Sequence, residues 1–236
     1  MKPPIVMLPG WRLGRGPLQP LADALGAEWY DLPGYRETPF TANFADAVTR
    51  LVATVPHGTI LMGWSLGAMI ALAAAARAPH HIGGVVAIGG TPSFVTRNEW
   101  PHGLAPQALA EFRAAIAEDE PAMLPRFVGG FNRGELESKT LTAEILATAD
   151  PAPPLEILLA GLDWLATVDL RAELPRITAP VLVIHGENDP LIPCAAGEAI
   201  AQNVPHGKWL PIPNAAHAPF LRHQAVMVEQ LSSFFW

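Results

Sequence analysis

The sequence predicts an α/β fold in which a mostly parallel sheet is flanked by helices and carries a helical insertion. The first observation behind this prediction is that short apolar or β-branched runs alternate with longer stretches of helical character. The second is that these runs are continuously apolar rather than alternating, as expected where helices cover both faces of a sheet. The third is that the segment 103–168 has helical character throughout and interrupts the alternation.

Five strands and five core helices follow from these patterns. The apolar runs predict strands at residues 5–8, 59–62, 85–88, 181–184 and 208–212. Amphipathic or small-residue periodicity predicts core helices at residues 18–25, 44–55, 66–78, 196–203 and 226–235. Together they define one α/β core made of residues 1–102 and 169–236.

The segment 103–168, called the helical insertion below, is expected to form a lid. Its periodicity predicts helices at residues 106–117, 122–131, 141–148 and 155–167. The strand 85–88 precedes it, so the insertion leaves the sheet at the carboxyl edge, where open α/β sheets bind ligands. The alternative is an ordinary helical extension of the core.

Composition narrows the functional classes. The chain has 236 residues, half of them apolar, which suits one domain with a large core. A net charge of −7 argues against a nucleic-acid partner, which would select clustered Lys and Arg. The single cysteine, Cys194, excludes an internal disulfide and fits a reducing compartment. With no export signal or membrane-spanning apolar run visible, we expect a cytoplasmic protein without a membrane partner.

The motif Gly63-Trp64-Ser65-Leu66-Gly67 indicates a nucleophilic serine. It matches the G-x-S-x-G pattern, and it stands between the predicted strand 59–62 and the predicted helix 66–78. This strand-turn-helix context is typical of the nucleophile elbow of α/β hydrolases, in which glycines permit a very sharp turn. We therefore predict an α/β-hydrolase fold with Ser65 as the nucleophile.

A serine nucleophile needs a base and an acid that orients the base. In the α/β-hydrolase fold these residues follow one another along the chain in the order Ser, acid, His. Of eight histidines, His217 lies in a loop of small residues between the last strand and the last helix, and we predict it as the base. Asp189 follows the strand 181–184 and is the predicted acid, with Glu187 as its competitor. His185, at the end of the same strand, is explained equally well by backbone geometry.

Two backbone N–H groups must hold the charge that develops on the substrate oxygen. The residue after the nucleophile supplies one, so Leu66 is predicted; the loop after the first strand supplies the other, so Trp11 is predicted. The sequence has no metal-ligand spacing, no phosphate loop and no dinucleotide-binding motif, and we therefore expect no metal and no cofactor.

Six segments spread over nearly the whole chain carry a resemblance to a known family. They are Pro9-Gly10-Trp11, Asp31-Leu32-Pro33-Gly34, Gly63-Trp64-Ser65-Leu66-Gly67, Asn98-Glu99-Trp100-Pro101, Val168-Asp169-Leu170-Arg171 and Ala215-Ala216-His217-Ala218-Pro219-Phe220. The triad segments alone would indicate only an α/β hydrolase, whereas the Glu-Trp-Pro stretch, the Val-Asp-Leu-Arg stretch and the Ala-Ala-His-Ala-Pro-Phe loop are more particular. On these segments the chain resembles the pimeloyl-acyl-carrier-protein methyl ester carboxylesterases of biotin synthesis.

The resemblance implies a substrate, a partner and contact residues. The implied reaction is hydrolysis of the methyl ester of a pimeloyl chain on an acyl-carrier protein. The implied carrier contacts are Arg126 and Lys139, although alanines stand at two other positions (122 and 143) where the family uses arginine. Pro9 replaces the histidine usual in the oxyanion loop. The implied substrate contacts are Trp11, Ser65, Leu66, Phe127, Val128, Gly129, Gly130, Phe131 and His217.

Three other functions stay open on the sequence alone. A broad carboxylesterase for short or medium acyl esters would use the same triad without a protein partner. A hydrolase of carbon–carbon bonds would use it on a different bond. A non-enzymatic binding protein of the same fold usually has an incomplete triad, whereas every member is present here.

Overall fold

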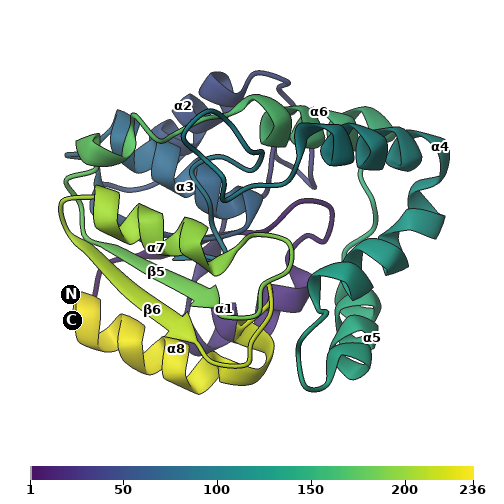
Figure 1. The fold of residues 1–236 in the computed structure, drawn as a ribbon. Coiled ribbons are helices and arrows are strands. Elements are labelled where there is room, and N and C mark those ends of the chain that lie inside the picture. The colour runs from purple at the N-terminus through teal and green to yellow at the C-terminus, as the bar shows by residue number, and fades with distance from the viewer. Residues whose placement is uncertain (1) are drawn as a thin grey trace.

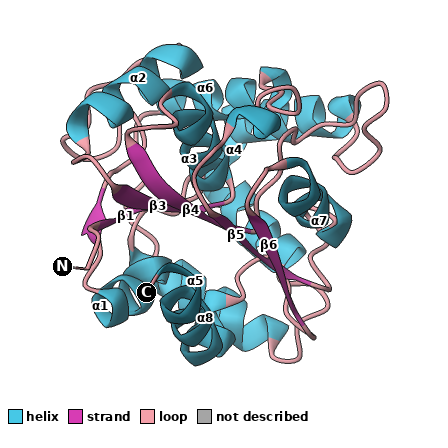
Figure 2. Ribbon diagram, turned by 90° about the vertical axis from the view of Figure 1, so that its left-hand side faces the viewer, coloured by secondary structure: helices cyan, strands magenta, loops and turns pink. Residues whose placement is uncertain are grey.

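A parallel sheet of six strands forms the middle layer of the molecule, between two layers of helices (Figure 1, Figure 2). The structure is a computed structural model and describes residues 2–236. The strand order is β2-β1-β3-β4-β5-β6, and every pairing is parallel. The strands are β1 Ile5–Leu8, β2 Glu28–Trp29, β3 Thr59–Trp64, β4 Ile82–Ile88, β5 Val181–Gly186 and β6 Gly207–Ile212.

The five predicted strands are confirmed, and four of them extend by one to three residues beyond the predicted ends. The sixth, β2, escaped prediction because it has only two residues, Glu28 and Trp29, which are too few for a hydrophobic pattern. It pairs with β1 and forms one edge of the sheet.

Helices cover both faces of the sheet, as predicted. Figure 2 shows α2, α3 and α7 on one face and α1 and α8 on the other. Alternate strand side chains supply the two cores: Val85 and Ala87 of β4 belong to the first face, and Val86 and Ile88 to the second. The bounds are α1 Gln19–Leu25, α2 Phe44–Thr54, α3 Leu66–Arg77, α7 Cys194–Asn203 and α8 Phe220–Phe235, with short 3-10 helices at Gly16–Leu18 and Leu174–Arg176.

The predicted start of α8 at residue 226 is wrong. The helix begins at Phe220, six residues earlier, and His223 interrupts its first turns with non-helical angles (φ −118°, ψ 23°). Because this break disturbs the 3.6-residue periodicity, the sequence pattern becomes regular only beyond it.

The helical insertion consists of α4 Pro106–Phe131, α5 Ser138–Thr148 and α6 Leu155–Thr167. The helix α4 contains a kink at Asp119 (φ −153°, ψ 82°), between the two helices predicted at 106–117 and 122–131. All four predicted helical segments are thus present. In Figure 1 the insertion occupies the right-hand side of the molecule, away from the two chain termini. None of the helices among residues 2–236 has the length together with the apolar character that a membrane span requires.

The backbone of the turn between β3 and α3 packs closely against neighbouring backbone. A Cβ atom on Gly63 would lie 2.3 Å from the carbonyl oxygen of Gly67, and one on Gly67 would lie 2.4 Å from the carbonyl oxygen of Leu8. Real Cβ atoms do not come so close to backbone atoms, so only glycine allows the turn. At its tip Ser65 has a φ of +56°, which is strained for a residue with a side chain.

Gly67→Ala should therefore destabilise the fold, by about 1–3 kcal/mol, as is usual for overpacking a filled site. For a chain of this size each kcal/mol corresponds to about 2–4 °C in Tm. Gly130→Ala is the matched control, since nothing lies within 4 Å of its added methyl group and Gly130 sits in a helix. Thermal unfolding should give a lower Tm for the first variant and an equal or higher Tm for the second; equal losses would contradict the steric account.

Candidate active site

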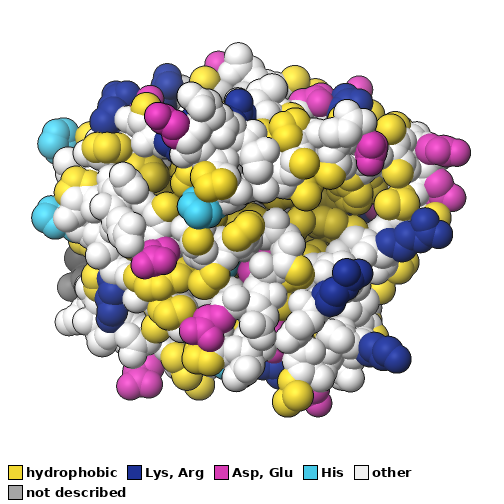
Figure 3. Space-filling model, in the orientation of Figure 1, with side chains coloured by type: hydrophobic (Ala, Val, Ile, Leu, Met, Phe, Trp, Pro, Cys, Tyr) yellow, Lys and Arg dark blue, Asp and Glu magenta, His cyan; other side chains and the backbone are white. Residues whose placement is uncertain are grey.

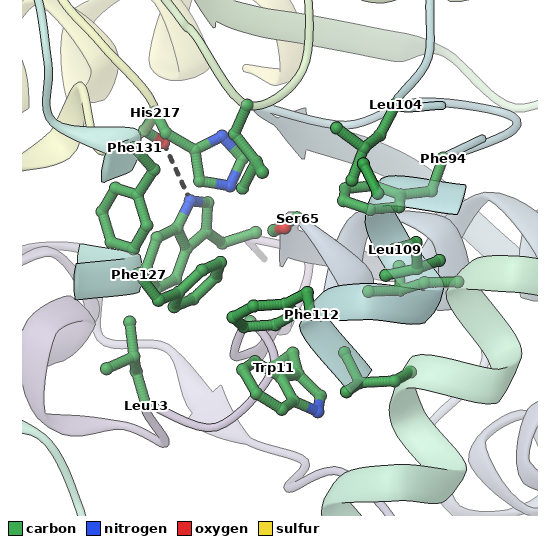
Figure 4. Close-up of a pocket in the computed structure, with 16 residues that line it drawn as sticks. Trp11, Leu13, Ser65, Phe94, Leu104, Leu109, Phe112, Phe127, Phe131 and His217 are labelled. Carbon is green, nitrogen blue, oxygen red and sulfur yellow. Dashed lines mark hydrogen bonds between the residues drawn. The ribbon is translucent and has the colours of Figure 1, made fainter. Parts of the chain in front are cut away.

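Ser65 lies at the end of β3 and faces a cavity beneath the helical insertion (Figure 4). Its backbone N–H donates to the carbonyl oxygen of Ile88 at 2.9 Å, which anchors the turn to β4. Its own carbonyl oxygen accepts from Ala68 and Met69 in the first turn of α3. The turn therefore holds the serine at the N-terminus of α3, with its side chain partly exposed to the cavity.

His217 and Asp189 form a buried hydrogen-bonded pair. The imidazole Nδ1–H donates to the Asp189 Oδ2 atom at 2.6 Å. The other carboxylate oxygen, Oδ1, accepts from the backbone N–H groups of Leu191 and Ile192 at 2.9 Å each. The competing acid, Glu187, is exposed. The structure thus brings Asp189, and not Glu187, against the histidine ring.

The environment of Asp189 keeps its carboxylate ionised. Burial alone would raise its pKa, but the neighbouring His217 and the hydrogen bonds from His185 and His217 outweigh burial and hold the pKa well below the usual value for Asp. An ionised carboxylate at this place fixes the tautomer of His217, because it requires a hydrogen on Nδ1 and leaves Nε2 without one.

His185 contacts the same carboxylate, and the sequence does not predict this contact. Its Nε2 atom lies 2.9 Å from the Ile192 carbonyl oxygen and 3.2 Å from Asp189 Oδ2. Both partners are acceptors, so Nε2 carries the hydrogen. The spacing of four residues between His185 and Asp189 around a turn was the available signal, and it is too common to single out a contact.

Aromatic side chains and one carboxylate hold the loop that carries His217. The indole N–H of Trp64 donates to the His217 carbonyl oxygen at 2.9 Å, drawn as a dashed line in Figure 4. The rings of Trp64 and Phe131 lie 5.6 and 5.4 Å from the imidazole, centroid to centroid. Glu135, from the helical insertion, accepts a hydrogen bond from the Ala216 N–H at 2.5 Å. The histidine loop is therefore fastened from the core and from the insertion.

The predicted oxyanion donors lie where α3 begins and where β1 ends. Leu66 is the first residue of α3, and Trp11 lies in the loop after β1, which lines the cavity. Within residues 2–236, neither backbone N–H has a hydrogen-bond acceptor. The Trp11 indole N–H is occupied by the Leu158 carbonyl oxygen of α6, at 2.9 Å.

The cavity has a volume of about 200 Å³ and an almost wholly apolar wall. Of the predicted substrate contacts, Trp11, Ser65, Phe127, Phe131 and His217 line it. The side chains of Leu66 and Val128 are instead buried in the two cores, and Gly129 and Gly130 lie outside the lining. The remaining lining residues are Gly10, Leu13, Trp64, Phe94, Leu104, Ala108, Leu109, Phe112, Leu162, Leu165 and Leu191. They come from separate segments, and no sequence pattern could have grouped them.

A groove adjoins the cavity and shares four of its lining residues, so it forms the mouth. Arg126, Arg133 and Gly130 lie along this groove. Within residues 2–236, neither arginine side chain has a hydrogen bond or an ion pair. Lys139 is exposed on α5 and is not part of the groove lining. Figure 3 shows dark blue Lys and Arg side chains beside the yellow hollow at the right.

Groups capable of other chemistry are few. Among residues 2–236, no cluster of three or more His, Cys, Asp or Glu side chains could hold a metal ion. The thiol of Cys194 is free, and burial, together with nearby Glu187, Asp189 and Glu198, raises its pKa. A raised pKa disfavours the thiolate and therefore nucleophilic attack by this sulfur.

Comparison with solved structures supports the fold. The chain is similar to a bromoperoxidase from Bacillus anthracis, with a TM-score of 0.85, 22% identity, and coverage of 99% of this chain and 92% of that one. It is also similar to an esterase from Exiguobacterium antarcticum, with a TM-score of 0.82, 20% identity, and coverage of 99% and 91%. At these identities the likeness concerns the fold alone.

Comparison with family models and curated proteins is more specific. Residues 3–224 match the model of the alpha/beta hydrolase fold. The chain is 36% identical to a pimeloyl-[acyl-carrier protein] methyl ester esterase from Aromatoleum aromaticum, with 98% of each chain covered. It is 34% identical to a protein of that name from Xanthomonas oryzae, with 98% and 94% covered, and 31% identical to one from Yersinia enterocolitica, with 98% and 92% covered. The chain therefore belongs to the α/β-hydrolase family and, within it, to the pimeloyl-[acyl-carrier protein] methyl ester esterase family.

Proposed function

We propose that this chain is a serine carboxylesterase that hydrolyses the methyl ester of a pimeloyl chain carried by an acyl-carrier protein, a step of biotin synthesis. The observation that carries the chemistry is the strained Ser65 at the floor of an apolar cavity that His217, hydrogen-bonded to a buried carboxylate, also lines. The relatives that bear this name over nearly the whole chain support the substrate.

The reaction proceeds as two acyl transfers. The Ser65 oxygen attacks the ester carbonyl while Nε2 of His217 accepts the hydroxyl proton. The carbonyl oxygen becomes an oxyanion, and the backbone N–H groups of Trp11 and Leu66 donate to it. His217 then gives the proton to the departing methoxy group, and methanol leaves. Water repeats the sequence on the acyl-enzyme, which releases the carboxylate and restores the serine.

Asp189 makes His217 an effective base. Because its carboxylate accepts the Nδ1–H at 2.6 Å, Nε2 is the imidazole atom free to receive the Ser65 proton. The negative charge also stabilises the imidazolium that forms during each transfer. The depressed pKa of Asp189 keeps that charge in place at every pH at which the histidine can act.

The cavity suits a polymethylene chain better than a polar substrate. Its aromatic wall includes Trp11, Phe112 and Phe127, whose ring centroids lie 5.3–5.7 Å from one another. Each methylene group buried there contributes about 0.8 kcal/mol. Apolar burial therefore favours a chain of several methylene groups over a short acyl group.

The carrier would bind outside the cavity, at the groove that forms its mouth. Arg126 and Lys139 are the contacts that the resemblance implies, and Arg133 joins Arg126 along the groove. Free cations here provide a local attraction for an acidic carrier although the whole chain has a net charge of −7. We propose a cytoplasmic location, which the single free thiol, Cys194, supports because it fits a reducing compartment.

Ser65→Ala should abolish ester hydrolysis and labelling by a fluorophosphonate, because Ser65 is the hydroxyl that forms the acyl-enzyme. The loss in kcat should be about 10³-fold or more. Steady-state kinetics on a chromogenic ester and gel-based labelling measure the two effects. Labelling that persists in the variant would place the nucleophile elsewhere.

Asp189→Asn should slow turnover by about 10⁴-fold while the protein stays folded, because an amide can present its N–H to Nδ1 and force the wrong tautomer on His217. Glu187→Gln is the matched control, since that carboxylate is exposed. Its kcat should stay within about twofold of the native value. A large loss in the control, or near-native turnover in Asp189→Asn, would contradict the assignment.

Arg126→Glu and Arg133→Glu should each raise KM for the carrier-bound ester more than KM for a small soluble ester. The difference should shrink at high salt, because exposed charges interact over a Debye length of about 8 Å at physiological ionic strength. Arg50→Glu serves as the control: Arg50 is also exposed and forms no ion pair within residues 2–236, but it lies on α2, outside the groove. An equal rise in KM for all three variants would contradict a local carrier site.

The assignment of substrate is tested by kinetics and by genetics. The specific enzyme should prefer the carrier-bound methyl ester over short soluble esters by a large factor in kcat/KM. The gene should also restore growth without biotin to a host that lacks its own pimeloyl-ester esterase, whereas the Ser65→Ala version should not. Failure of the native gene, despite activity on simple esters, would favour the broad carboxylesterase.

A further inference from the structure

We propose that Arg12 is a positioning residue that links the oxyanion donor Trp11 to the helical insertion through Glu120. The inference rests on the proposed function only for the role of the Trp11 N–H. It goes beyond that function in assigning a task to the insertion: besides covering the cavity, the insertion holds the oxyanion loop in a conformation that the loop would not keep by itself.

The backbone at Arg12 is strained. Its φ is +71°, in the left-handed region that residues with a side chain rarely adopt. The Leu13 N–H donates to the Trp11 carbonyl oxygen at 2.9 Å, which closes a three-residue turn around Arg12. A positive φ at the centre of such a turn marks the rare, strained form of the γ-turn. Strain of this kind persists only where surrounding contacts impose it.

Contacts from the insertion impose this conformation. The Arg12 Nε–H donates to the carboxylate of Glu120 in α4, and Nη1–H donates to the Asp150 carbonyl oxygen at 3.0 Å, between α5 and α6. From the core, the Tyr35 hydroxyl accepts from the Arg12 backbone N–H at 3.0 Å. The side chains of Arg12 and Glu120 are only 9% and 12% exposed. Removing either partner therefore leaves a nearly buried charge unpaired.

The position of Glu120 depends on the kink in α4. Asp119, the residue before it, has the non-helical angles, and its carboxylate accepts from the Ala122 N–H at 3.0 Å, so it caps the second half of the helix. Glu120 is thus fixed at the junction of two helical segments. A shift of either segment would carry Glu120 away from Arg12.

The same loop meets the insertion at further points. Asp150 accepts from the Arg15 N–H at 3.2 Å, and the Leu13 carbonyl oxygen accepts from the Asp150 N–H at 2.9 Å. A Cβ on Gly14 would lie 2.4 Å from the Asp150 carboxylate. The loop is therefore packed directly against the insertion, and the direction of the Trp11 N–H depends on where the insertion lies.

Glu120→Ala tests the link. The variant should lower kcat on a small soluble ester by about tenfold or more, towards the 10²–10³-fold loss typical of a missing oxyanion donor. KM should stay within about twofold, because the cavity is unchanged, and the inhibition constant of a trifluoromethyl ketone, whose adduct carries an oxyanion, should rise with the loss in kcat. A KM that rises while kcat is retained would contradict the proposal.

Asp163→Ala is the matched control. Asp163 pairs with Arg113 at 2.7 Å within the insertion, but both side chains are exposed and neither touches the oxyanion loop. Its kcat should stay within about twofold of the native value. Equal kcat values in Glu120→Ala and Asp163→Ala would overturn the inference.

Arg12→Gly separates positioning from general stability. Glycine adopts a positive φ without strain, so this variant should lose less kcat than Glu120→Ala, and the Glu120 carboxylate that it leaves unpaired is absent from the double variant. Adding Glu120→Ala to Arg12→Gly should change kcat by less than twofold. Should Glu120→Ala fail to fold, Glu120→Gln replaces it, with a smaller loss of kcat, because the neutral amide oxygen still accepts from the Arg12 Nε–H. A further tenfold loss in the double variant would contradict the link. Failure of the proposed function would appear separately, as activity that survives Ser65→Ala.

Discussion

The active site is organised around one buried charge, the carboxylate of Asp189. Burial of an ionised group is costly, and four hydrogen bonds offset the cost: from the N–H groups of Leu191 and Ile192 and from the rings of His185 and His217. These bonds tie the end of β5 to the loop after β6. The position of the histidine, and with it the geometry opposite Ser65, follows from satisfying this single charge.

The helical insertion completes a site that the core only begins. The core supplies the strained serine turn and the Asp–His pair, whereas the insertion supplies much of the apolar wall and the arginines at the mouth. Carboxylates of the insertion reach the core loops: Glu135 accepts from the Ala216 N–H beside the histidine, Glu120 from the Arg12 side chain beside Trp11, and Asp150 from the Arg15 N–H. The substrate specificity and the positions of the catalytic loops therefore both depend on the helical insertion.

Whether a feature could be predicted from the sequence depends on how far apart in the chain its interacting residues lie. The strand runs, the Gly63–Gly67 turn and the choice of Ser65, Asp189 and His217 depend on local patterns or on fixed positions at a sheet edge. The structure brings Asp189 and His217 into contact, and Ser65 and His217 line the same cavity. The two-residue β2 is too short, and the kinked start of α8 too irregular, to show a hydrophobic period in the sequence. Phe112, Arg133 and the contacts of His185 and Arg12 arise from residues distant in sequence, which no pattern in one chain brings together.

The central claim, that Ser65 passes the acyl group from an ester to water, is tested most directly by rapid-quench mass spectrometry. The enzyme is mixed with a slowly deacylated ester, quenched within one turnover and digested, and the acyl group is located on its peptides. We predict one acyl group per enzyme on the peptide containing Ser65, formed together with one equivalent of released alcohol. Release of alcohol without a covalent adduct, or an adduct on another residue, would contradict the account.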